Sequence, residues 1–85
     1  MEKRLGFIGI IVEDRKKTAS RINSILSDFG DIIVARMGLP YDKRGCSAIV
    51  LIVDANTDEL GALTGRLGAI EKVIVKSALA KRQNQ

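Results

Sequence analysis

The sequence predicts an α+β fold with four strands and two helices in the order βαββαβ. Three observations lead to this prediction. The chain has 85 residues, which is the length of one small domain. Four segments are rich in Val, Ile and Leu, and turn residues separate them. Two further segments place their apolar residues at the three- and four-residue spacing of an amphipathic helix.

The first half of the chain is predicted to contain a strand, a helix and a second strand. Residues 5–12 form the first apolar run, and Asp14 follows as the predicted N-cap of the helix. Gly30 comes directly after the last apolar residue of that helix, where a left-handed residue is common. The second strand is expected over residues 31–38. The apolar side of the helix consists of Ile22, Ile25, Leu26 and Phe29.

The second half repeats a strand, a helix and a strand. Residues 39–45 contain Pro40 and Gly45 and are predicted to form the turn that leads into it. Asn56 and Glu59 match the capping box of a helix N-terminus. The helix continues with Leu60, Leu63, Leu67 and Ile70. The two strands of this half are expected over residues 46–54 and 71–79.

This order of elements is that of the ferredoxin-like sandwich, an antiparallel four-stranded sheet with two helices on one face. We expect residues 1–80 to form this single domain and residues 81–85 to form a polar tail. On such a sheet, strands usually alternate between apolar and polar residues. Here residues 5–12 and 46–54 are apolar on both sides. Since the helices cover only one face, we predict that a second copy covers the other, in a homodimer or homotetramer.

Composition supports association over catalysis. Hydrophobic residues make up 46% of the chain, which is more than one small core readily buries. The chain has no histidine, the commonest general base and metal ligand, and its one cysteine is a poor nucleophile without a histidine partner. We therefore expect a protein that is not an enzyme and that binds no metal or cofactor. A lone cysteine fits the reducing cytoplasm, and no segment has the ~20 apolar residues of a membrane span.

Nucleic-acid binding is not expected either. The net charge of +4 is mild, and the positive residues are scattered along the chain, as is typical of a solvated surface. Phe7 is the one aromatic residue in the two strands that would be central, whereas RNA-binding sheets of this fold stack bases on several aromatics. The first helix has basic residues but commits its remainder to the core, so we expect no sequence-specific DNA binding.

Two groups of residues are candidates for a ligand site or an interface. The first group is Arg36, Met37, Gly38 and Tyr41. An arginine in an apolar strand must reach water, pair with a carboxylate or bind an anion. Glu13 and Asp54 are the candidate carboxylates. The alternative is that Arg36 and Tyr41 line a pocket for an anionic ligand between subunits.

The second group is Gly61 and Gly65, which lie four residues apart in the second helix. Each glycine inside a helix costs about 1 kcal/mol relative to alanine. A stripe of small residues lets another backbone approach. We expect it to pack against the first helix, or else against a ligand or a partner helix. Gly68 is a candidate C-cap of the same helix.

Three stretches carry a resemblance to a known family: FIGIIVEDR, ILSDFGDIIVARMGLPY and GALTGRLGAIEKVIVK. They resemble small ACT-like proteins described as regulators of the iron-only hydrogenase system. The resemblance covers residues 3 to about 78, and its most specific block is Arg36, Met37, Gly38 and Pro40. It implies an ACT-like fold and a role in transcriptional or maturation control.

The implied fold is similar to the C-terminal regulatory domain of the nickel-responsive repressors. Those proteins hold nickel through histidines and a cysteine, and a ribbon-helix-helix DNA-binding segment precedes the domain. This sequence has no histidine and, we expect, no room for that segment, so neither property carries over. Amino-acid-binding ACT domains usually place a glycine after the first strand, where this sequence has EDRKK. A ligand-sensing ACT-like domain that binds a small anion or amino acid between subunits is the alternative function.

Overall fold

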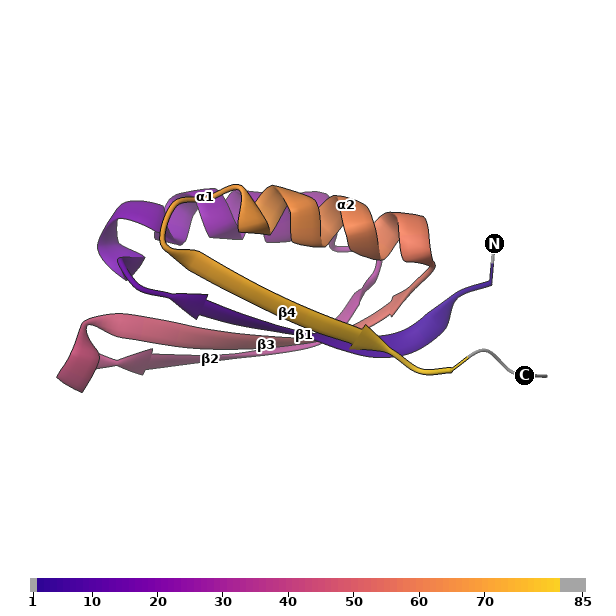
Figure 1. Cartoon of the computed structure of the whole chain (residues 1–85), viewed down its shortest axis with the longest axis horizontal. Helices are drawn as coiled ribbons and strands as arrows, with labels where there is room; N and C mark the ends of the chain where they lie inside the picture. The colour runs from indigo at the N-terminus through magenta and orange to yellow at the C-terminus, as the bar shows by residue number, and fades with distance from the viewer. Residues whose placement is uncertain (1, 82–85) are drawn as a thin grey trace.

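The computed structural model describes residues 2–81 and contains the predicted strands and helices (Figure 1). In chain order they are β1 (Arg4–Val12), α1 (Arg15–Asp28), β2 (Ile33–Tyr41), the short 3-10 turn η1 (Asp42–Arg44), β3 (Cys46–Ala55), α2 (Thr57–Gly68) and β4 (Val73–Leu79). The strands form one sheet in the order β2-β3-β1-β4, and all neighbours are antiparallel. The predicted ferredoxin-like fold is confirmed. The predicted tail at 81–85 lies, apart from Lys81, outside the described residues.

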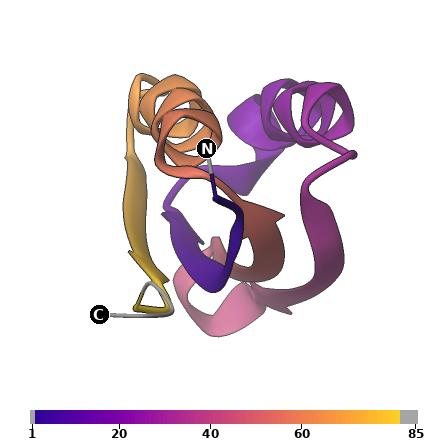
Figure 2. The ribbon, with the colours of Figure 1, turned by 90° about the vertical axis from the view of Figure 1, so that its right-hand side faces the viewer.

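The two helices lie side by side on the same face of the sheet, and no other described element covers the opposite face (Figures 1 and 2). The core fills the space between the helices and the sheet. Alternate residues of the two central strands point into it, and each is at most 1% exposed: Ile8, Ile10 and Val12 from β1, and Leu51, Val53 and Ala55 from β3. Ile22 and Leu26 of α1 and Leu63 of α2 close this core from above.

The predicted capping box at the start of α2 is confirmed. The backbone N–H of Glu59 donates to Oδ1 of Asn56 at 2.8 Å, and the backbone N–H of Asn56 donates to the Glu59 carboxylate at 2.9 Å. This second bond lowers the pKa of the Glu59 carboxyl. Desolvation acts in the opposite direction on that pKa, and the ammonium of Lys3, 3.3 Å from the carboxylate, lowers it further.

The ends of α1 differ from the prediction. Asp14 occupies the N-cap position, but its side chain makes no capping hydrogen bond. Gly30 does not adopt the left-handed conformation; among the described residues only Gly45 and Lys72 have a positive φ, of 65° and 63°. The helix closes instead through the backbone N–H of Phe29, which donates to the carbonyls of the last turn. Gly68 also stays inside its helix, and Ala69 is the C-cap.

The prediction for β2 was wrong at both ends. Pro40 was expected in the turn, but it pairs with Ser47 as part of the strand. A proline is tolerated here because β2 is an edge strand, where a missing N–H can lie on the unpaired side. The turn is therefore reduced to η1 and Gly45, whose left-handed φ is as predicted. The strand begins at Ile33, two residues later than expected, and its register shifts between Ile33 and Ala35. The last strand, β4, begins two residues later than expected.

Candidate functional site

The sheet face opposite the helices is apolar and exposed. In β1 and β3, the residues between the buried ones point to this side, and cross-strand partners in β2 and β4 share it. Its large apolar side chains are between 38% and 64% exposed: Leu5, Phe7, Ile11, Met37, Leu39, Tyr41, Val50 and Ile74. We call these eight residues the open face. The predicted apolar character of both sheet faces is thus confirmed.

Two charged residues lie on the same side of the sheet as the open face. Asp54 pairs with Leu5 across β3 and β1, and Lys76 pairs with Gly9 across β4 and β1. Both residues are exposed. One acid and one base on an otherwise apolar surface give it no net charge, so a second copy of the surface would not be repelled by it.

A second feature is a cavity of about 280 Å³ on the helix side, between α1 and the β2–β3 hairpin. We call it the hairpin cavity; its lining residues are Val12, Ala19, Ile22, Asn23, Arg36, Gly38, Leu39, Pro40, Ser47 and Ile49. Arg36 reaches from β2 to α1, where its Nη2 donates to Oδ1 of Asn23 at 3.2 Å. Gly38 contributes no side chain, and apart from its two neighbours in the chain, no described residue has a heavy atom within 4 Å of where its Cβ would be.

The structure separates the candidate residues around Arg36. Arg36 and Gly38 line the hairpin cavity, whereas Met37 and Tyr41 belong to the open face. Within one subunit, Arg36 and Tyr41 therefore do not line one pocket. Arg36 also makes no ion pair with the expected carboxylates in the described part of the chain; its partner is the neutral amide of Asn23. Sequence reasoning missed Asn23, and its one signal was an amide next to the buried Ile22.

The glycine stripe of α2 faces solvent. At Gly61 and Gly65, no atom outside the helix's own backbone lies within 4 Å of an added Cβ. The expected close packing of these glycines against α1 was therefore wrong. Near the C-terminal ends of the two helices, Arg66 of α2 forms an ion pair with Asp28 of α1 at 3.0 Å. The Arg66 guanidinium also lies 5.5 Å from the centre of the Phe29 ring.

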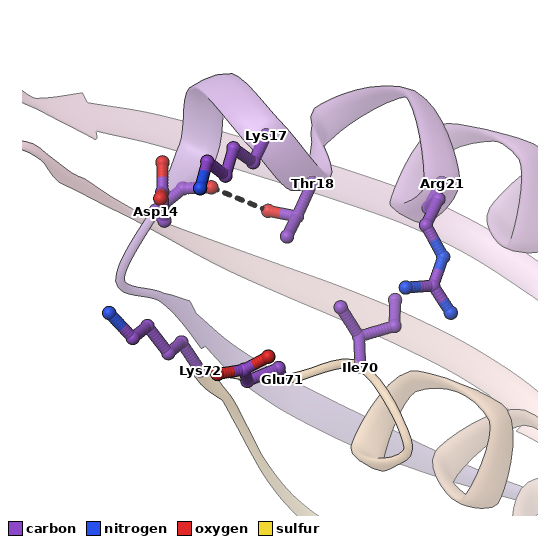
Figure 3. A pocket seen from close by; sticks show the side chains of 7 residues that line it. All are labelled: Asp14, Lys17, Thr18, Arg21, Ile70, Glu71 and Lys72. Atoms are coloured by element: carbon purple, nitrogen blue, oxygen red, sulfur yellow. Dashed lines mark hydrogen bonds between the residues drawn. The ribbon is translucent and has the colours of Figure 1, made fainter.

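A second cavity, of about 230 Å³, lies where the N-terminus of α1 meets the α2–β4 loop (Figure 3). Its charges are mixed, with Lys17, Arg21 and Lys72 opposed by Asp14 and Glu71. The hydroxyl of Thr18 is already used, because it donates to the backbone carbonyl of Asp14 at 2.8 Å. The cavity therefore has no group that requires a ligand.

The described residues were also compared with what a metal site and a membrane-spanning helix require. In the described part of the chain, His, Cys, Asp and Glu side chains nowhere gather in a group of three that could hold a metal ion. Within residues 2–81, no helix is long and apolar enough to cross a membrane.

Comparison with known proteins agrees with the fold. The TM1266-like family model, described as "Iron-only hydrogenase system regulator, putative", matches residues 4–77. The solved structure of the uncharacterized protein TM1266 from Thermotoga maritima is 38% identical, covers 94% of this chain and 100% of that chain, and has a TM-score of 0.90. The ACT domain of GTP pyrophosphokinase from Chlorobium tepidum is 26% identical, with 89% and 99% covered and a TM-score of 0.76.

A more distant structure shows the fold alone. It is CPII from Thiomonas intermedia K12, solved with ADP, AMP and acetate; it is 14% identical, with 96% and 94% covered and a TM-score of 0.52. No curated protein matches the chain. The sheet order, the two helices on one face and the similarity to an ACT domain define an ACT-like module. The chain belongs to the TM1266-like family, which is the family that the sequence resembles.

Proposed function

We propose that this chain is a non-enzymatic regulatory or binding module that acts as a homo-oligomer. The observation that carries the proposal is the open face, because eight large apolar side chains lie on one side of the sheet without cover from the described chain. In this proposal residues 1–80 form one ACT-like domain. The regulated process is the iron-only hydrogenase system that the family description names, through transcription or maturation.

The size of the open face supports a stable interface. Eight side chains that are each about half exposed present on the order of 800 Å², the area that one partner contributes to a standard interface. Typical monomers expose no apolar patch larger than about 300–600 Å². Two sheets that pack face to face bury such a surface completely, at a separation of about 10 Å.

A second copy is the occupant that the surface favours. A two-fold contact uses the same patch on both subunits, so the patch must be complementary to a second copy of itself. The open face meets this condition, because its few charged neighbours are one acid, Asp54, and one base, Lys76. A chain of 85 residues also buries a smaller share of its surface alone than a larger domain does, and it gains stability from association.

The remaining parts of the proposal concern chemistry and location. A chain without histidine and with one cysteine has few groups for catalysis, which supports a role other than that of an enzyme. Its lone cysteine supports a cytoplasmic location. We also infer that it binds no specific DNA sequence alone, and that its likeness to the nickel-repressor domain extends to the fold and not to the metal.

The alternative function is that of a ligand-sensing ACT-like domain. The hairpin cavity favours it, because a guanidinium with one neutral hydrogen-bond partner lies at its wall. In this form, a small anion held at Arg36 changes the association of subunits. The two functions are compatible if the ligand site and the open face occur in the same protein.

Native mass spectrometry of freshly purified protein tests both. The regulatory oligomer predicts ions at a multiple of the 9.2 kDa chain mass. The ligand-sensing alternative predicts an added small mass that disappears in Arg36→Ala. Monomer ions at every concentration would contradict the oligomer.

A further inference from the structure

The chemistry of the hairpin cavity specifies a ligand more closely than "a small anion". We propose that it binds a short, branched aliphatic monocarboxylate. The inference rests on the ligand-sensing form of the proposed function and gives it a ligand class. It is independent of the open face, which lies on the other side of the sheet.

The walls of the cavity are mainly aliphatic. Side chains from three strands and α1 form them: Val12, Ala19, Ile22, Pro40 and Ile49. Val12 and Ile22 are at most 2% exposed, so the floor is part of the core and is held in place by it. At about 280 Å³, the cavity lies just below the ~300–1,000 Å³ of sites for drug-sized molecules, which suits a body of four to six carbons.

Arg36 and Asn23 form a hydrogen-bonded polar pair in the lining. Arg36 uses one N–H on Asn23, so other donors of its planar fork remain for a carboxylate, which such a fork binds through two parallel hydrogen bonds. Oδ1 of Asn23 accepts from Arg36, and the amide nitrogen of Asn23 is a further donor among the lining residues. The hydroxyl of Ser47 is the third polar group of the lining.

The charge of the lining selects against amino acids. Among the described residues of the lining, Arg36 is the one that carries a charge, and none is Asp or Glu. A ligand with an ammonium group would therefore lose water from that group without gaining a partner, at a cost of several kcal/mol if it were fully buried. A carboxylate without an ammonium group meets no such cost.

Gly38 gives the cavity its room. A side chain at this position would meet no atom within 4 Å, so it would project into the space that the ligand needs. A larger residue here is thus expected to fill the cavity without disturbing the strand.

Amide chemical shifts of the ¹⁵N-labelled full chain, titrated with 3-methylbutanoate, test the proposal. We expect saturable shifts at Asn23, Gly38 and Ser47 with a dissociation constant on the order of 1 mM. Leucine, which adds an ammonium group, and 3-methylbutanol, which lacks the carboxylate, should each bind at least about tenfold more weakly. Absence of saturable shifts with 3-methylbutanoate, or equal binding of leucine, would overturn the proposal.

Two variants and one control complete the test. Arg36→Gln keeps a polar side chain and removes the charge, and Gly38→Val fills the cavity; each should weaken 3-methylbutanoate binding about tenfold or more. Gly61→Ala, which also adds a side chain into open space, should bind like the unmodified chain. Unchanged binding by Arg36→Gln would overturn the proposal even if Gly38→Val failed to fold. The molar mass of Arg36→Gln, measured in parallel, reports on the oligomer separately, so failure of ligand binding and failure of the oligomer are distinguishable.

Discussion

Truncation of Phe7 is the sharpest perturbation of the open face. Phe7 lies on the central strand β1, next to Ile52 on β3 and Ala78 on β4, and it is 53% exposed. It is not part of the buried core. Phe7→Ala should therefore remove a contact between subunits while it leaves the fold of each subunit intact.

The expected effect follows from the exposed area. A phenylalanine offers 150–250 Å² in total, so about 100 Å² of Phe7 is available to a partner. At about 25 cal/mol per Å² this amounts to ~2.5 kcal/mol for each copy, and ~5 kcal/mol for a two-fold pair in which both copies change. Since interface area converts only partly into affinity, we expect a loss of about 2 to 5 kcal/mol, or a roughly 30- to 5,000-fold larger dissociation constant.

Sedimentation equilibrium over the micromolar range measures this change. The unmodified chain and Lys16→Ala serve as references, because Lys16 is an exposed residue of α1 on the other side of the molecule. Circular dichroism establishes that Phe7→Ala is folded. If the folded variant associates as strongly as the two references, the open face is not the interface.

Three further predictions concern the fold that presents these surfaces. Asn56→Ala removes the acceptor for the Glu59 backbone N–H and should lower the free energy of unfolding, measured in urea, by about 1 kcal/mol. The control Ser20→Ala on α1 should change that free energy by less than about 0.5 kcal/mol. Equal effects of the two substitutions would contradict the capping role. Gly45→Ala should destabilise the protein by about 1 kcal/mol because φ is 65° at this position. Gly61→Ala should stabilise the protein by a similar amount because alanine favours the helix and its side chain meets open space. Urea midpoints that move in the same direction for both variants would refute this argument. The pKa of Glu59 is lowered in the folded state, mainly by the Asn56 N–H, so its contribution to stability is present above the ordinary value of 4.5 and is lost as the pH falls through the lowered pKa. Glu59→Gln should therefore flatten the acid side of the stability profile, and an unchanged profile between the variant and the parent chain would count against this linkage.

Local signals were sufficient to predict most of the fold. The capping box at Asn56 depends on residues three positions apart, and the strands follow from short apolar runs, so neither requires knowledge of the tertiary structure. Pro40 shows the limit of such signals. Whether a strand can include a proline depends on whether it lies at the edge of the sheet, which is a property of the whole fold. The prediction for Gly30 was wrong for a similar reason, because α1 ends without a left-handed residue and the chain continues directly to the buried Ile32.

The candidate site was predictable in part. The open face followed from strands that are apolar on both sides, with Val50 and Ile11 as examples. The two-residue period of a strand places Arg36 and Tyr41 on opposite faces, but the sequence prediction ended the strand at residue 38 and put Tyr41 in the turn. The contact between Arg36 and Asn23 could not be predicted from the sequence, because it depends on how α1 packs over β2. The orientation of Gly61 likewise depends on which side of α2 meets the core.

The central claim is that the open face packs against a second copy of itself. An isotope-filtered NOE experiment on a mixture of ¹³C-labelled and unlabelled chains tests it most directly, because it detects only contacts between different copies. The account predicts intermolecular NOEs from the side chains of Phe7, Ile11 and Ile74 to one another's residues. Absence of such NOEs at concentrations where the mixed oligomer forms, or intermolecular NOEs confined to the outer surface of α2 around Ala62, would contradict it.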